Sequence, residues 1–442
     1  MITTFYKLII SLILIAAGFQ GLAQTISDSL KMYLEKAEKN NPAVLQKFIE
    51  YQAALQKVHQ AGSLPDPEIS TGVFLQPMEI VNGSQIAEVR LMQMLPWFGV
   101  LKNAKNEMNL MANAKYEALI DAKQQLHFEV QRTWYELYKT RKNINIYEKN
   151  MAILTAIERL ASVKFKASYL SESMPSSSGM NNQIDKDASG SLLADLYRIQ
   201  LEKNELRNNI TLLKSQEVSE IALFNSYLNR PSGHPVYTDS LIVIDSSQFT
   251  ITEVIHSVKE KNPMLKMFEF ENQSYLARKK MVTGMSYPMT GAGVSYSLIS
   301  KNDMSVSAMN GKDMIMPMIS ITLPVYRNKY NAMKKEADLM SQAATMNYIS
   351  AVNSLEVESY QAFQSYQDAL RRIQLFEEQY DLANKSLNIM LKNFYTSGTD
   401  LTEVLRLYQM TLDYELKKAE AEADLNIAAA SLKRLMAIPL SN

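Results

Sequence analysis

Two long stretches of the chain, 99–166 and 328–394, carry apolar residues at a spacing that alternates between four and three. Both stretches lack proline, and glycine occurs in them only at Gly99. A sustained period of about 3.5 residues predicts helices that pack as left-handed coiled coils. Each helix would be about 100 Å long at about 1.5 Å per residue. The stripe of the second stretch contains Tyr348, Val352, Leu355, Ser359, Ala362, Tyr366, Ala369, Ile373, Phe376, Tyr380, Ala383, Leu387, Met390 and Phe394.

Ahead of each long helix, two short segments alternate apolar and polar residues with the period of a β-strand. The segments span about 68–75 and 85–95 in one region and about 290–299 and 313–323 in the other, with loops at 76–83 and 300–312. Each has about the 9–11 residues that a tilted membrane-spanning strand needs. Pro317 lacks an amide donor, so we expect a local bulge in the fourth strand.

The two faces of these strands differ in polarity. One face of the second, third and fourth strands is apolar: Ala87, Val89, Leu91, Leu95, Ala292, Val294, Tyr296, Leu298, Ile315, Ile319, Ile321 and Leu323. The opposite face holds Glu88, Arg90, Met92, Met94, Gly293, Ser295, Ser297, Met314, Met316, Met318, Ser320 and Thr322. Such alternation is typical of a membrane β-barrel with a wet interior. A half-buried sheet in a soluble protein is the alternative.

The order helix, strand, strand, long helix, helix occurs twice. Asn41-Pro42 recurs as Asn262-Pro263, and Leu95-Pro96 recurs as Leu323-Pro324. We therefore predict a first repeat at 24–229 and a second at 251–442, joined by a crossover at 230–250. The first helices are expected at 29–62 and from Thr252. The return helices are expected at about 191–228 and 400–435, after a long break at about 168–190 and a short one at 396–399.

Residues 1–23 are typical of a secretory signal. Lys7 provides the positive start, an apolar run follows from Leu8 to Phe19, and Gly21-Leu22-Ala23 supplies small residues before the expected cleavage. A membrane anchor is the alternative, but the run is shorter than the ~20 residues that a spanning helix needs. We therefore expect an exported protein without a helical anchor.

Composition excludes several classes of function. The 46 basic and 46 acidic residues give a net charge of zero, which does not indicate a nucleic-acid partner. The chain has no cysteine, which excludes disulfides, thiolate metal sites, a cysteine nucleophile and lipid attachment through cysteine. The four histidines stand at no ligand spacing. No nucleophile–base motif or phosphate loop is present, so we expect neither an enzyme nor a bound cofactor.

Four strands per chain do not close a barrel, and open sheet edges are not tolerated in lipid. The strands therefore predict an oligomer, and three chains would supply twelve strands. In its whole mature length the chain resembles the outer-membrane efflux (TolC-like) family. The resemblance rests on the duplicated unit, Pro65-Asp66-Pro67, Pro96-Trp97-Phe98-Gly99 and the segment 394–405. Pro-Asp-Pro and Pro-Trp-Phe-Gly look like the heavy-metal, RND-associated branch.

The resemblance implies a mainly α fold with a small transmembrane β part: a long coiled-coil α-barrel below a twelve-stranded outer-membrane β-barrel, shared by a homotrimer. It places the protein in the outer membrane of a Gram-negative bacterium, with a long periplasmic extension. It further implies a periplasmic membrane-fusion adaptor and an inner-membrane RND or ABC transporter as partners.

Candidate functional residues lie in two regions. On the polar face of the strands, Glu88 and Arg90 are candidates for lining the lumen. The alternative is a pair that only fixes the strand register and has no role in transport. Met314, Met316 and Met318 share that face, and thioethers suit Cu(I) or Ag(I). Methionine as flexible packing is the alternative; the chain contains 26.

The second region is the segment that begins the last helix. Asp400 is a candidate gate residue, or else an N-terminal carboxylate favoured by the helix dipole. Gly398, Leu401, Glu403, Val404 and Leu405 resemble an adaptor-docking stretch, with turn chemistry and coiled-coil packing as the alternative.

Three functions remain open on the sequence. The first is an exit duct of a tripartite efflux pump, with heavy-metal cations as a candidate cargo. The second is a duct of the same fold for general drug efflux or type I protein secretion. The third is a periplasmic coiled-coil scaffold that forms no channel.

Overall fold

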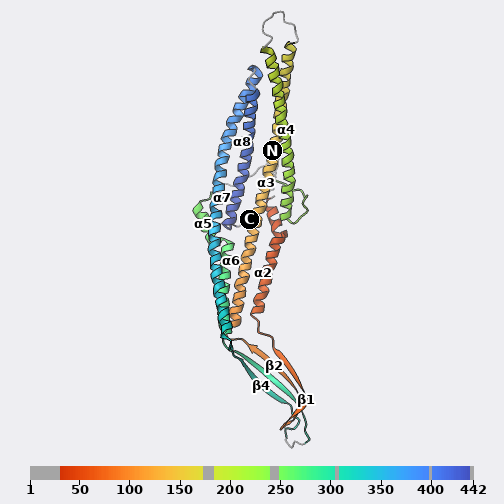
Figure 1. The fold of residues 1–442 in the computed structure, drawn as a ribbon, viewed down its shortest axis with the longest axis vertical. Coiled ribbons are helices and arrows are strands. Elements are labelled where there is room, and N and C mark those ends of the chain that lie inside the picture. Colours follow the sequence, from red (N-terminus) through yellow and green to blue (C-terminus); the bar gives the residue numbers. More distant parts are fainter. Residues whose placement is uncertain (1–29, 173–183, 239–247, 304–307, 398–400, 439–442) are drawn as a thin grey trace, which may run out of the picture. The chain divides into compact units, whose positions relative to one another are not determined.

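The computed structural model describes residues 30–172, 184–238, 248–303, 308–397 and 401–438. The predicted signal segment, 1–23, lies outside them. Figure 1 shows the elements in chain order, and their bounds are α2 Pro42–Ala61, β1 Glu68–Ile80, β2 Gly83–Leu95, α3 Val100–Glu172, α4 Ile184–Tyr227, α5 Ile251–Lys261, α6 Pro263–Met285, β3 Met289–Ser300, β4 Met314–Thr322, α7 Arg327–Ser397 and α8 Leu401–Leu435.

The chain forms two compact units. The sheet unit consists of Gln46–Ala122 and Lys261–Ser354, and the helical unit consists of Met1–Leu45, Lys123–Glu260 and Leu355–Asn442. The sheet unit contains all four strands together with α6 and parts of α2, α3 and α7. None of the helices in the described residues combines the length and the apolar character that a membrane crossing requires.

Asparagine–proline pairs start two of the helices. Asn262 caps α6, because its side chain accepts a hydrogen bond from the Met264 amide and Pro263 occupies the first turn. Asn41 accepts in the same way from the amides of Ala43 and Val44. The single helix expected over 29–62 is therefore wrong, since residues 30–40 and α2 are separate helical segments on either side of Asn41.

The four strands form one antiparallel sheet in the order β1-β2-β3-β4 (Figure 1). The loop expected at 76–83 is wrong, because β1 continues to Ile80 and the chain turns at Val81 and Asn82. The register between β1 and β2 shifts between Val73 and Met78. This irregularity accommodates Pro77, which has no amide hydrogen for the ladder.

The bulge expected at Pro317 is absent. The register between β3 and β4 runs without a shift from the Met289–Thr322 pair to the Ser297–Met314 pair, and Pro317 stands opposite Val294. Pro317 is tolerated because β4 ends the strand order, so that one edge of the strand has no partner among the described strands.

The apolar stripes of the long helices form the core of the helical unit. Leu154, Leu387 and Phe394 belong to one cluster of buried residues, which also includes Ile199 of α4 and Tyr408 of α8. Every residue of the predicted stripe of α7 is buried or half-buried. Even Ser359, its polar member, is fully buried, and its hydroxyl donates to the Leu355 carbonyl at 2.7 Å.

Candidate functional site

One face of the sheet brings together all five residues expected to line a lumen. The strand register places Glu88 of β2 opposite Ser297 of β3, which stands opposite Met314 of β4. In the next rows Arg90 is linked in the same way to Met316, and Met92 to Met318. Residues directly opposite in an antiparallel sheet point to the same face. The three rows therefore form one continuous surface, which we call the polar face.

The charges of the polar face neutralise each other locally. Arg90 Nη2 lies 3.0 Å from Glu88 Oε1, and the two side chains are 45% and 23% exposed. Ser295 donates its hydroxyl hydrogen to the same carboxylate, and Gln85 Nε2 donates to the Ser297 hydroxyl at 3.0 Å. An exposed ion pair of this kind contributes little to stability, because water and salt screen it. Its main effect is to present both signs of charge to solvent along one surface.

Methionine sulfur covers the other end of the polar face. Met94 stands opposite Gly291 and Met92 opposite Gly293. A Cβ on Gly291 would lie 2.7 Å from the Met94 sulfur and 3.2 Å from the Met92 sulfur. The two glycines therefore leave the space that these thioethers fill. We did not predict Met92 and Met94 as site residues; the signal available was glycine at alternate positions of β3, opposite methionine at alternate positions of β2.

The reverse face of the sheet is apolar and exposed. Ile319 is 85% exposed, Val73 72% and Ile69 68%. Further exposed apolar residues of this face are Val89, Leu91, Val294, Tyr296, Leu298, Ile315 and Ile321. A contiguous apolar surface of this extent marks contact with a membrane or with another protein.

The expected docking residues at the start of α8 divide into two groups. Leu401, Val404 and Leu405 are buried in the core of the helical unit. Glu403 is half-buried and forms an ion pair with Arg406 of the next turn. Gly398 and Asp400 lie outside the described residues. Of the five candidate docking residues, Glu403 therefore has the most accessible side chain among those described.

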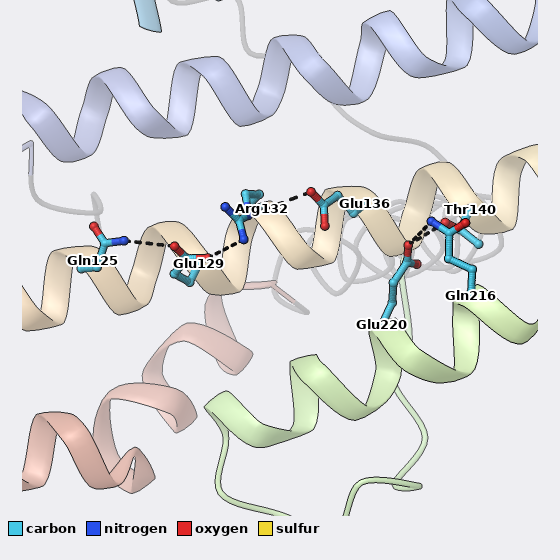
Figure 2. Close-up of polar contacts among 7 residues, drawn as sticks. All are labelled: Gln125, Glu129, Arg132, Glu136, Thr140, Gln216 and Glu220. Atoms are coloured by element: carbon cyan, nitrogen blue, oxygen red, sulfur yellow. Dashed lines mark hydrogen bonds and ion pairs between the residues drawn. The ribbon is translucent and has the colours of Figure 1, made fainter. Parts of the chain in front are cut away.

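A chain of polar contacts follows the surface of α3 within the helical unit (Figure 2). Gln125 donates to Glu129 at 3.0 Å, and Arg132 lies 3.0 Å from Glu129 and 4.0 Å from Glu136. These side chains on successive turns hold each other through contacts spaced three or four residues apart.

At the far end of Figure 2, Glu220 of α4 accepts hydrogen bonds from Thr140 at 3.0 Å and from Gln216 at 2.9 Å. Burial raises the pKa of the Glu220 carboxyl, and the hydrogen bonds from Gln216 and Thr140 offset part of that rise. Glu220 is only 9% exposed, so its carboxyl lies within the packed helices and not on their solvated surface.

No group of three or more His, Asp or Glu residues in the described part of the chain is placed to hold a metal ion. The thioethers of the polar face are candidate ligands for a soft metal ion.

No protein-family model matches the chain, and a comparison with curated proteins finds no match. Solved structures do match. The outer membrane protein VceC from Vibrio cholerae has a TM-score of 0.72 at 11% identity, over 93% of this chain and 97% of that one. The outer-membrane channel OprN has a TM-score of 0.70 at 15% identity, over 92% and 89%.

CusC, whose structures describe folding and transmembrane channel formation, has a TM-score of 0.68 at 14% identity, over 92% of each chain. These similarities cover both the sheet and the helices of this protein. The chain has the fold of the outer-membrane channel proteins, as its resemblance to the outer-membrane efflux (TolC-like) family implied.

Proposed function

We propose that this protein is the outer-membrane exit duct of a tripartite efflux pump. The observation that carries the proposal is the sheet with two contrasting faces, one apolar and exposed, the other polar and charged, in a chain with the fold of outer-membrane channels. An apolar face suits lipid, and a polar face suits a water-filled lumen. The same order of elements before and after 230–250 supports two copies of one repeated unit.

The proposal requires oligomerisation. Within the described residues, β1 and β4 end the sheet, and each leaves one edge unpaired. Unpaired backbone groups cost several kcal/mol each in lipid. Edge pairing between three copies would remove these edges and close a barrel of twelve strands. We therefore propose a homotrimer in the outer membrane of a Gram-negative bacterium.

The helices would extend from this barrel into the periplasm. We propose that they form a tunnel through which cargo passes from a periplasmic adaptor and an inner-membrane RND or ABC transporter. The accessible pair Glu403 and Arg406 supports a docking surface near the start of α8. The duct itself would be passive and would need no catalytic site. The energy for transport would come from the inner-membrane partner.

As the cargo we propose heavy-metal cations of the soft class, Cu(I) or Ag(I). Met314, Met316 and Met318 share the polar face with the charged pair Glu88 and Arg90. Thioethers are soft ligands that favour Cu(I) over harder divalent ions. A general drug duct would need no such concentration of sulfur on the surface that faces the cargo.

The proposal is tested by deleting the gene and restoring it on a plasmid. We expect the deletion strain to accumulate copper or silver and to grow poorly in their presence, and the plasmid to restore both properties. Sensitivity to dyes or detergents without any metal phenotype would reject the metal cargo and retain the efflux duct. A protein recovered as a monomer from the soluble fraction, without detergent, would reject the duct itself.

A further inference from the structure

Two thioethers of β2 converge on one point above β3. The Met94 sulfur lies 2.7 Å and the Met92 sulfur 3.2 Å from the place where a Cβ on Gly291 would stand. The Met92 sulfur also lies 3.0 Å from the corresponding place on Gly293. Both sulfurs thus lean from their own strand across the neighbouring one, because the two glycines offer no side chain to stop them.

We propose that Met92 and Met94, with Met318 as a third ligand, form a binding site for one soft monovalent metal ion, Cu(I) or Ag(I). Met318 stands opposite Gly293 on the side of β3 away from Met92. Met92 and Met318 therefore stand on either side of Gly293, which has no side chain to separate them. We call Met92, Met94 and Met318 the thioether site. Its role in cargo transit rests on the proposed function, whereas binding itself needs only the sheet.

The chemistry of the site favours metal ions that are monovalent and soft. A zinc–thiolate bond is about 2.3 Å long, which gives the scale of a metal–sulfur bond, and both sulfurs lie within 3.2 Å of one point. One ion can therefore reach both with small rotations of flexible side chains. Thioethers carry no charge and no proton, so the site would favour a weakly hydrated monovalent ion over a hard divalent one. For the same reason binding would not release protons, in contrast to histidine or cysteine sites.

The surroundings of the site leave it open and electrically balanced. Met92, Met94 and Met318 are all half-buried, so that solvent reaches them. The nearest charged row of the polar face contains Arg90, whose charge is paired with Glu88 at 3.0 Å. Ser320 of β4 stands opposite Gly291 and is the other neighbour of the site. An uncharged sulfur site beside a neutralised ion pair presents little repulsion to an incoming cation.

The test uses the full chain purified in detergent and titrated with Ag(I), which avoids redox chemistry, by calorimetry and native mass spectrometry. We expect one strongly bound Ag(I) per chain, with the same affinity at pH 6 and pH 8. The double variant Met92→Leu, Met94→Leu should lose this ion, since leucine keeps the volume but removes the sulfur. The matched control is Met340→Leu, Met346→Leu, which removes two exposed methionines of α7 and should keep the ion.

A second variant changes the geometry and keeps every sulfur. Gly291→Ala places a Cβ 2.7 Å from the Met94 sulfur, the movable end of a side chain, and so should displace it. We expect at least a tenfold weaker Ag(I) affinity. Unchanged Ag(I) binding in both variants, or no binding by the folded wild-type protein, would overturn the thioether site.

The result is separable from the proposed function, because binding is measured on the isolated protein and efflux on the deletion strain. A dye-sensitive deletion strain whose protein binds no Ag(I) would reject the site alone. A protein that binds Ag(I) in a strain without any efflux defect would support the site and reject the exit duct.

Discussion

Lys142 of α3 and Glu422 of α8 form an ion pair across the helical unit, with Nζ 2.5 Å from Oε2. The two side chains are 32% and 14% exposed, so that the pair is largely shielded from water. Burial alone would lower the pKa of the Lys142 ammonium, but hydrogen bonding and attraction by Glu422 outweigh it and raise the pKa. Since the folded-state pKa is raised, the stabilisation is complete at neutral pH and is lost only as the pH rises through it.

We therefore expect Glu422→Gln to lower the free energy of unfolding by about 1.5–3 kcal/mol, the range for hydrogen bonds to charged groups. Denaturant titration of the detergent-solubilised protein at pH 7 measures this change. The control is Glu148→Gln, which removes the exposed pair with Lys214 and should cost less than about 1 kcal/mol. Equal losses in the two variants would show that the shielding of the Lys142 pair has no energetic effect.

The buried carboxyl of Glu220 predicts a pH dependence of the same sign, but in a lower pH range. Its folded-state pKa is raised by burial, so the folded state binds the proton more readily than the unfolded state does. Stability should therefore fall as the pH rises from the ordinary carboxyl pKa through the raised value, and then level off. Glu220→Gln keeps an acceptor for Thr140 and Gln216 and removes the charge, so it should raise the unfolding temperature more at pH 8 than at pH 5.

Thermal unfolding followed by circular dichroism at the two pH values tests this expectation. The control is Glu217→Gln, which removes the negative charge from the ion pair of 2.7 Å with Arg141 and should lower the unfolding temperature at both pH values. A Glu220→Gln variant that is less stable at pH 8 would contradict the prediction.

The two faces of the sheet predict contrasting effects of an introduced charge. Ile319→Arg places a cation on the apolar face, where it should cost about 2–4 kcal/mol if the residue lies near the bilayer midplane. Met316→Arg introduces the same side chain in the same strand on the polar face and should be tolerated. The fraction of heat-resistant trimer on a detergent gel measures both. Equal losses would argue against a lipid-facing apolar surface.

The ion pair on the polar face predicts a change in ion preference. Glu88→Gln leaves Arg90 without its partner and should shift a channel toward anions, while Arg90→Gln should shift it toward cations. The reversal potential across a planar bilayer under a salt gradient measures the preference. Val89→Gln, on the opposite face, is the control and should leave it unchanged. If neither charge variant moves the reversal potential, the pair does not line the conducting path.

Substitutions at the start of α8 should affect either the stability of the fold or the binding of the adaptor, depending on whether the residue is buried. Leu401→Ala should cost about 2–5 kcal/mol, because Leu401 is 1% exposed and its loss leaves a cavity. Glu403→Lys should leave stability nearly unchanged and weaken association with the periplasmic adaptor. Photo-crosslinking from position 403 in cells that contain the whole pump tests the contact. Full association of the Glu403→Lys variant would place docking elsewhere.

The sequence was sufficient for the elements whose pattern repeats over many residues. The apolar stripe of α7 was predicted residue by residue, because a long helix without proline leaves one way to bury that stripe. The two faces of β2, β3 and β4 followed from alternation alone. Strand pairing then placed Glu88 and Met314 on one surface, as the polarity of the strand faces predicted.

The sequence was insufficient where one residue chooses between two local outcomes. Asn41 before Pro42 both ends one helix and caps the next, which periodicity does not reveal. The polar residues around Pro77 predict a loop, but Pro77 lies within β1, at a shifted register. Pro317 needed no bulge, because the edge position of β4 is known only once the strand order is known. Likewise, the sequence did not identify Met92 as a site residue, because its pairing with Gly293 is known only from the strand register.

The unbroken register between β3 and β4 also constrains how this sequence can change in evolution. Since side chains alternate, deletion of a single residue within β4 would exchange the two faces of every following position. Substitutions can accumulate in that strand, but changes of length are confined to the connection that precedes it. The pairing around Pro77 shows this consequence within one strand: from the Val73–Ala87 pair to the Met78–Gln85 pair β1 advances five residues and β2 two, so odd- and even-numbered positions of β1 exchange faces across the irregularity.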